Sequence, residues 1–255
     1  MKSSTLVRSL VLPLLCALLV AGGRVITAAE TPATDGKADA ASPADSKPAK
    51  PAEKKLRTLG IVLYPRFELL DAYGPAEIFG NLAGRIKVVT VAQKAGPVAS
   101  TQGPQGVADF SFDDCPPLDL ILVPGGFGTL AELKNEALLS WLRTRAQSAE
   151  LVMSVCSGSS ILAQAGLLDG RRATSNKQYF SFATDRAPKV EWVKEARWVD
   201  DGNIVTSSGV SAGIDMSLHV VQRLFGNETA ERIANATEYQ WHRDADSDPF
   251  AKFAK

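Results

Sequence analysis

The hydrophobic positions of this chain form short apolar runs that alternate with longer stretches of helical spacing. From residue 56 onward the apolar runs are bounded by Gly, Pro or Asp, which is typical of buried strands. Between them, apolar residues recur every three or four positions and indicate amphipathic helices. The predicted strands are Leu59–Leu63, Ile86–Ala92, Val98–Thr101, Val107–Phe112, Leu118–Val123, Leu151–Val155, Arg172–Ser175, Val190–Val193, Ala196–Val199 and Asn203–Ser207. Leu69–Leu82 is predicted to contain a turn and then a helix, with Gly74-Pro75 near the start of that helix. The other predicted helices are Thr129–Gln147 (capped by Thr129), Ile161–Leu168, Ser211–Phe225 and Thr229–Tyr239.

This alternation of strands and helices predicts an α/β fold with a mainly parallel sheet that is covered on both faces. Two of the predicted strands, Val98–Thr101 and Val107–Phe112, have Gly103 and Gly106 between them and are expected to form a hairpin. Ligands of such sheets bind at the carboxyl ends of the strands. Three features follow predicted strands in this way: Asp71, the pair Gly125-Gly126, and Cys156.

The amino-terminal residues follow a different pattern. Lys2 and Arg8 precede an apolar run, Leu10–Ala21, and small residues end the segment at Ala29. This order is typical of a signal peptide, here 1–29, so we expect export to a periplasm or beyond, and no stable membrane insertion after cleavage. An uncleaved anchor is the alternative. Residues 30–55 are rich in Ala, Pro, Lys and Asp without apolar periodicity, which predicts a disordered linker before a domain at 56–255.

The net charge of the chain argues against one class of partner. Its 28 basic and 28 acidic residues balance, so the sequence lacks the excess of positive charge that is typical of nucleic-acid-binding proteins. The sequence has no Gly-rich nucleotide loop and no metal-ligand spacing, and its two histidines, His219 and His242, stand apart. We therefore expect no cofactor, no metal and no nucleic-acid partner.

The most informative stretch is Leu151–Leu168, in which a strand leads through Cys156, Ser157 and Gly158 into a helix. A nucleophile at such a sharp turn stands clear of the sheet, and the start of the helix favours a thiolate. The alternative is a structural cysteine, because free cysteines are often buried. Cys115 begins a neighbouring strand whereas Cys156 ends its own, so parallel strands would hold the thiols roughly 20 Å apart, too far for a disulfide.

Asp71 lies among Leu69, Leu70 and Tyr73. Burial there would raise the pKa of its carboxyl group and suit it to proton transfer. The alternative role is that of a helix N-cap.

Five stretches in one order resemble the ThiJ/PfpI superfamily, which has a class I glutamine-amidotransferase-like, flavodoxin-type fold. Within it the likeness is greatest to isocyanide (isonitrile) hydratases and to the amidotransferase-like domains of AraC-type regulators. The stretches are LLDAYGPAEIFG (69–80), DCPPLDLILVPGGFG (114–128), SVCSGSSILAQAGLLDGRRAT (154–174), GNIVTSSGVSAGIDMSLHVVQRLFG (202–226) and Glu238-Tyr239.

The resemblance implies roles for particular residues. It makes Cys156 the nucleophile and Asp71 the acid that bonds to it. Ser157 takes the position after the nucleophile, and the backbone amides of Gly125 and Gly126 face the thiol as oxyanion or binding groups. Many relatives carry a His where this chain has Asn176, which argues against a Cys–His dyad.

The resemblance also implies a function: hydration of a small electrophile, an isocyanide first of all, by a homodimeric enzyme. The alternatives are another cysteine enzyme of the amidase or glyoxalase type, and a redox-sensing or small-molecule-binding domain without catalysis.

Overall fold

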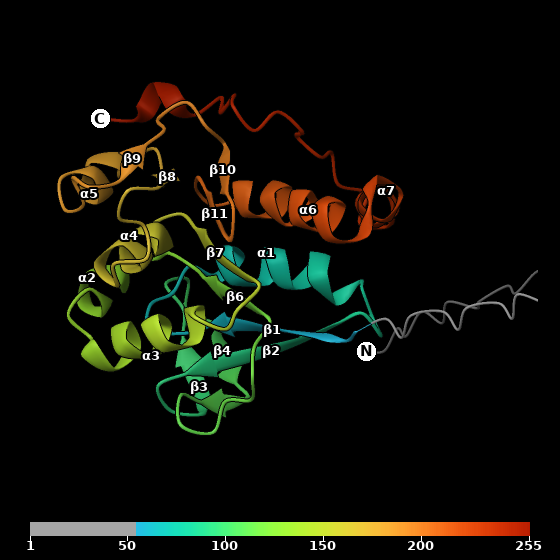
Figure 1. Ribbon diagram of the computed structural model, residues 1–255, viewed down its shortest axis with the longest axis horizontal. Coiled ribbons are helices and arrows are strands. Elements are labelled where there is room, and N and C mark those ends of the chain that lie inside the picture. The colour runs from blue at the N-terminus through green and yellow to red at the C-terminus, as the bar shows by residue number, and fades with distance from the viewer. Residues whose placement is uncertain (1–54) are drawn as a thin grey trace, which may run out of the picture. The chain divides into compact units, whose positions relative to one another are not determined.

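The computed structural model describes residues 55–255, so the predicted signal peptide and nearly all of the linker lie outside the described part. Its main sheet has seven strands in the order β10-β11-β7-β6-β1-β2-β5 (Figure 1). These strands are β1 (Arg57–Val62), β2 (Ile86–Ala92), β5 (Phe110–Ser111), β6 (Leu120–Val123), β7 (Leu151–Val155), β10 (Trp198–Asp201) and β11 (Ile204–Ser207). All neighbours in this sheet are parallel except β10 and β11, as the alternation of strands and helices predicts.

Helices cover the sheet on both sides and make a three-layer, flavodoxin-like sandwich (Figure 1). On one side α1 packs against α6, which packs against α7, and on the other side α2 and α3 pack against α4. The helices are α1 (Leu69–Gly80), α2 (Thr129–Glu132), α3 (Glu136–Ala146), α4 (Gly158–Gln164), α5 (Phe180–Thr184), α6 (Ala212–Phe225), α7 (Asn227–Ala236) and the 3-10 turn η1 (Ala251–Phe253). With both faces covered, every residue of β6 and β7 is buried, which explains their unbroken apolar runs.

Two smaller sheets lie beside the main one. The antiparallel pair β3 (Gly96–Ala99) and β4 (Gln105–Ala108) confirms the predicted hairpin. Phe110 and Ser111 leave this hairpin, however, and join the edge of the main sheet beside β2. The short strands β8 (Arg172–Ala173) and β9 (Glu191–Trp192) pair with each other instead of extending the main sheet.

The predicted helices over 129–147 and 161–168 differ from those observed, and one observed helix was not predicted. The predicted helix Thr129–Gln147 is two helices, because the Asn135 side chain accepts from the amide of Leu138 and starts α3 as its N-cap. Thr129 does not cap α2, whose N-cap residue is Gly128. The helix after Cys156 begins earlier than predicted and ends before Gly166, whose positive φ of 78° is typical of a helix terminus. The short helix α5 was not predicted.

The hydrophobic core is continuous across the sheet and includes both cysteines of the described part, Cys115 and Cys156, which are free thiols as predicted. Within residues 55–255 no helix combines the length and the apolar character that crossing a membrane requires.

Candidate active site

The turn between β7 and α4 presents Cys156 at the carboxyl edge of the sheet. Cys156 has a φ of 59°, a conformation that non-glycine residues adopt at a cost and that is common at functional sites. Its amide donates to the carbonyl oxygens of Ser207 and Ser208, at 3.2 and 3.0 Å, which anchors the turn to the end of β11. A Cβ atom on Gly158 would lie 2.2 Å from the Val123 carbonyl oxygen, so only glycine lets the chain turn here. These contacts confirm the predicted elbow.

Asp71 lies within the first turn of α1 and is fully buried. Its Oδ2 accepts a 2.8 Å hydrogen bond from the amide of Gly125, so it does not cap its own helix. Burial raises the pKa of this carboxyl group well above its usual range, although the Gly125 amide and the nearby Cys156 thiol oppose that rise. The other oxygen, Oδ1, has no well-formed hydrogen bond in the described residues. Asp71 therefore presents a free, buried carboxyl oxygen beside the nucleophile candidate.

The environment of the thiol differs from the prediction in one respect. Burial raises the pKa of Cys156 well above its ordinary value, and the charge of Asp71 adds to this. The Ser157 amide and side chain and the Asn176 amide act in the opposite direction, but burial outweighs them. The expectation that the start of the helix holds a thiolate was therefore wrong: α4 spans only seven residues, and desolvation dominates. The structure thus places a buried thiol beside a buried carboxyl group, and burial raises the pKa of both.

Asn176, which stands where the resemblance found in the sequence would place a His, contacts the thiol directly. Its Nδ2 donates to Sγ of Cys156 at 3.1 Å, while its Oδ1 accepts from the amide of Tyr179 at 3.1 Å. The second bond fixes the orientation of the side-chain amide, so the donor faces the sulfur. An amide can stabilise a thiolate but cannot exchange a proton at neutral pH. The sequence shows that no His stands at position 176, but it does not show that the Asn176 side chain donates to the sulfur.

Ser157 belongs to a chain of hydroxyl groups behind the thiol. Its Oγ accepts from the amide of Gly126 at 3.1 Å and lies 2.9 Å from Oγ1 of Thr129. Thr129 Oγ1 lies 3.1 Å from the Tyr64 hydroxyl, which donates to the carbonyl of Pro124 at 2.7 Å. Both amides that were expected to face the thiol are therefore engaged, Gly125 by Asp71 and Gly126 by Ser157. The loop still lies against the elbow, because a Cβ on Gly125 would be 2.9 Å from that of Cys156.

A cavity of about 410 Å³ opens onto Cys156. Its mouth is aromatic: the rings of Phe127 and Tyr179 meet edge to face with centroids 6.4 Å apart. The remaining lining residues are Glu68, Gly126, Thr129, Leu130, Ser157, Asn176, Gln178, Phe182 and Val210. This lining suits a small neutral group at the sulfur and an apolar group at the mouth.

The two histidines lie elsewhere. His219 is on α6 and bonds Asp200, while His242 contacts the carbonyl of Ser247. In the part of the chain that the structure describes, no three side chains of His, Cys, Asp or Glu converge as metal ligands would.

A buried ionic cluster underlies this region. Arg197 bonds Asp215 of α6 at 2.6 Å and lies 3.5 Å from Asp248 of the carboxyl-terminal tail. Lys177, the residue after Asn176, donates to Thr174 and to the carbonyl of Ala196 and lies 3.9 Å from Asp248. Asp215 thus pairs with a buried arginine, although its place near the start of α6 favours a role in ordering the helix start.

The mainly parallel sandwich, with a cysteine on a strand-to-helix elbow and a buried acid beside it, defines a flavodoxin-like protein with a cysteine centre. Residues 57–223 match the DJ-1/PfpI family. The chain belongs to this family, which confirms the resemblance found in the sequence.

Relatives of the chain include both an enzyme and regulators. It is 38% identical over 182 residues to the isonitrile hydratase of Pseudomonas putida, a match that covers 71% of this chain and 78% of that protein. It is 28% identical over 195 residues to the HTH-type transcriptional regulator GbdR of Pseudomonas aeruginosa, covering 74% of this chain but only 53% of the regulator. The crystal structure of a ThiJ/PfpI family protein from Pseudomonas syringae superimposes with a TM-score of 0.67 at 35% identity, covering 82% and 84% of the two chains.

Proposed function

We propose that the chain is a cysteine-dependent hydratase that converts a small isocyanide into the corresponding N-formamide. The observation that carries this proposal is the pairing of Cys156 with a buried Asp71 whose Oδ1 has no hydrogen-bond partner among the described residues. The similarity to an isonitrile hydratase over most of both chains supports the choice of substrate.

The proposed reaction has two stages. In the first, the sulfur of Cys156 forms a bond to the terminal carbon of the isocyanide, and the proton shared by Cys156 and Asp71 passes to that carbon, giving a thioimidate. In the second, water adds to the same carbon while Asp71 accepts one of its protons. The nitrogen takes up a proton, the C–S bond breaks, and the thiol is restored as the formamide leaves. No oxidant or reductant is consumed.

Each neighbour of the sulfur has a part in this scheme. Asn176 donates to the sulfur as it gains negative charge and again as it leaves the carbon. The amide of Gly125 keeps Oδ2 of Asp71 occupied, so proton transfer runs through Oδ1. The raised pKa of Asp71, caused mainly by burial, supports a carboxyl group that takes part in proton transfer.

The raised pKa of Cys156 also favours an enzyme over a peroxide sensor. Cysteines that sense oxidants are exposed and have a low pKa, whereas Cys156 is 7% exposed and its pKa is raised by burial. In the proposed enzyme the neighbouring carboxylate removes the thiol proton while the sulfur attacks. Cys156 can therefore be protonated before the substrate binds and still act as the nucleophile.

A direct assay tests the proposal. The wild-type protein and the Cys156→Ala and Cys115→Ala variants are incubated with an aryl isocyanide, and the formamide is measured by chromatography. We expect formamide from the wild type and from Cys115→Ala, and none above background from Cys156→Ala. A wild-type protein that hydrates no aryl or alkyl isocyanide, but turns over an amide or a 2-oxoaldehyde, would replace the hydratase with another cysteine enzyme.

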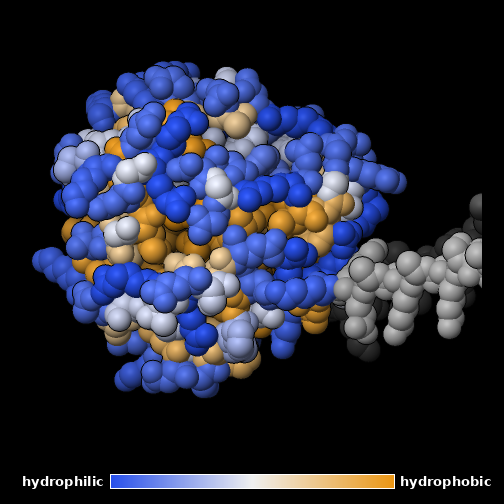
Figure 2. All heavy atoms as spheres, viewed as in Figure 1, coloured by the Kyte–Doolittle hydropathy of each residue, from blue (hydrophilic) through white to orange (hydrophobic). Residues whose placement is uncertain are grey.

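Two further properties belong to the proposal. Export rests on the amino-terminal pattern, and cell fractionation with a cytosolic marker protein tests it. A homodimer is supported by apolar side chains that gather in a band across the face shown in Figure 2. On α1, Leu70 and Tyr73 are 43% and 42% exposed. Light scattering at micromolar concentration should give twice the chain mass, and a monomer would contradict the proposal.

A further inference from the structure

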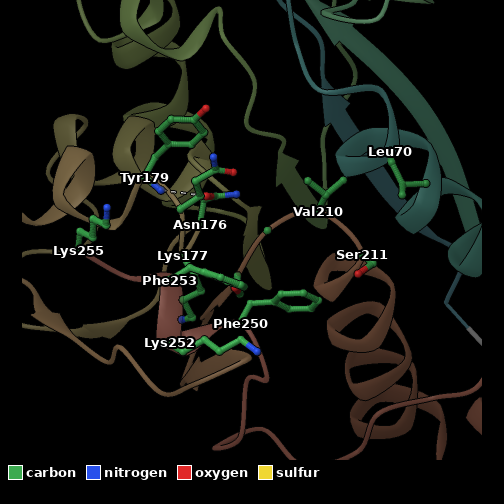
Figure 3. Close-up of a pocket in the computed structure, with 13 residues that line it drawn as sticks. Leu70, Asn176, Lys177, Tyr179, Val210, Ser211, Phe250, Lys252, Phe253 and Lys255 are labelled. Carbon is green, nitrogen blue, oxygen red and sulfur yellow. Dashed lines mark hydrogen bonds between the residues drawn. The ribbon is translucent and has the colours of Figure 1, made fainter.

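A second and larger cavity adjoins the one that contains Cys156. Its volume is about 810 Å³, against about 410 Å³ for the cysteine cavity. The two cavities share four lining residues, Asn176, Gln178, Tyr179 and Val210. Figure 3 shows an open space with Asn176, Phe250 and Lys252 on one side and Val210, Ser211 and Leu70 on the other. A ligand longer than an isocyanide group alone can therefore reach from the sulfur into this space.

The lining of the second cavity is cationic. None of its residues is acidic, while three are lysines: Lys177, Lys252 and Lys255. The ammonium group of Lys177 is already bonded to Thr174 and Ala196. Lys255 lies farther from the open space, whereas the side chain of Lys252 extends beside Phe250 toward it (Figure 3). Among the described residues Lys252 forms no ion pair, and its ammonium group lies over the ring of Phe253, 5.2 Å from the centroid, a contact that leaves its hydrogen-bond donors for a ligand.

A serine that contacts the cysteine turn also lines this cavity. Ser208 is 1% exposed and directly follows β11. Its own carbonyl accepts from the amide of Cys156 at 3.0 Å, so one residue both lines the cavity and holds the backbone of the nucleophile.

Apolar side chains complete the wall, namely Leu70, Val210, Phe250 and Phe253. A cation, a serine in the lining and an apolar wall together fit an organic anion whose body is apolar and whose end is a carboxylate. We infer that this cavity holds the carboxylate end of the substrate, so that the substrate class is an isocyanide with an apolar spacer and a terminal carboxylate. Only one part of this inference, that the reacting end of the substrate is an isocyanide, rests on the proposed hydratase function.

Binding of the product tests the cavity without relying on turnover. The probes are 4-formamidobenzoate and its methyl ester, which differ in the charge of one group, and affinity is measured by calorimetry on the full domain. We expect the carboxylate to bind the wild type about five- to tenfold more tightly than the ester, as for one charge-assisted contact. Lys252→Gln should remove this preference, and Ser208→Ala should reduce it. Lys94→Gln is the matched control, because Lys94 is an exposed lysine in the turn before β3 and lies outside both cavities. This variant should keep the preference for the carboxylate over the ester.

Turnover separates this inference from the proposed function. The substrates are 4-isocyanobenzoate, a longer isocyano carboxylate and their methyl esters. The inference predicts that the carboxylates have a lower KM than their methyl esters in the wild type. It also predicts that Lys252→Gln raises the KM of the carboxylates and leaves kcat unchanged. Hydration of acids and esters with equal kcat/KM, and equal binding of both products, overturns the inference and leaves the hydratase intact. Selective binding of the carboxylate without hydration of any isocyanide sustains the anion site and rejects the hydratase.

Discussion

Nδ2 of Asn176 donates to Sγ of Cys156 at 3.1 Å, and the amide of Tyr179 holds the other side of the same side chain at Oδ1. This places a fixed neutral donor where a base would otherwise stand. This donor can stabilise negative charge that develops on the sulfur, but it cannot take the proton of the thiol. Proton transfer then falls to Asp71.

The first prediction concerns this donor. Asn176→Ala should slow alkylation of Cys156 by iodoacetamide about tenfold at fixed pH, because loss of one hydrogen bond to a charged sulfur raises the pKa of the thiol. Gln178→Ala removes a neighbouring amide that is not bonded to the sulfur and serves as the matched control. Mass spectrometry of the modified cysteine as a function of pH gives the rate. Equal rates for wild type and Asn176→Ala would show that the contact has no effect on reactivity.

The second prediction concerns Asp71. Asp71→Asn keeps the shape of the side chain but cannot exchange a proton, so kcat/KM for an isocyanide should fall by about 10²–10⁴. His219→Ala and His242→Ala should change it little, since neither side chain reaches the cysteine cavity. Circular dichroism confirms that the variants fold. If Asp71→Asn stays active while a His variant fails, proton transfer runs through a histidine.

The third prediction uses two glycines with opposite surroundings. A Cβ on Gly125 would lie 2.6 Å from Oγ of Ser157 and 2.7 Å from its backbone nitrogen, so Gly125→Ala should lower the free energy of unfolding by about 1–3 kcal/mol. At Gly80, the end of α1, a Cβ meets nothing within 4 Å, so Gly80→Ala should be neutral or stabilising by up to about 1 kcal/mol. Urea denaturation measures both. Equal effects at the two sites would contradict the close approach of the loop to the elbow.

The fourth prediction concerns pH and Lys177. Burial lowers the pKa of Lys177 to about 8, although Asp248 and Glu195 oppose this, whereas an unfolded lysine has a pKa of about 10.4. Between these values the unfolded chain binds more protons than the folded one, so the contribution of Lys177 to stability rises with pH, by roughly 2–3 kcal/mol at most. Lys177→Met should flatten that rise between pH 8 and 10. The comparison uses the slope of unfolding free energy against pH, so a uniform loss of stability in the variant does not affect it.

Much of the fold could be read from local patterns, because the central strands of the main sheet are mostly apolar and are bounded by polar residues or by Gly and Pro. β2 and β7 were predicted with their observed bounds. The break at Asn135 could not be seen from periodicity, since apolar residues keep their spacing on both sides of it. The N-cap tendency of asparagine was the available signal. The displacement of β8 and β9 from the main sheet depends on tertiary pairing, which short strands do not encode.

The sequence predicts which residues meet at the candidate site, because the order of strands and loops along the chain is enough to place them at one edge of the sheet. Cys156, Asp71, Ser157 and the glycine pair converge as expected. What the sequence could not supply was the direction of each bond: Gly125 donates to Asp71, Gly126 donates to Ser157, and Asn176 donates to the sulfur. The pKa of the thiol was predicted in the wrong direction, because a local pattern shows the helix start but not the depth of burial.

The cluster of Arg197, Asp215, Asp248 and Lys177 connects the segment after α7 to the neighbourhood of the thiol. Asp248 lies 3.9 Å from Lys177 and 3.5 Å from Arg197, and Lys177 directly follows Asn176, the donor to the sulfur. Loss of the Asp248 carboxylate would leave the buried ammonium group of Lys177 without its acidic neighbour and would disturb the backbone that carries Asn176. A segment that contributes no atom to the cysteine therefore helps to set the position of the group that contacts its sulfur.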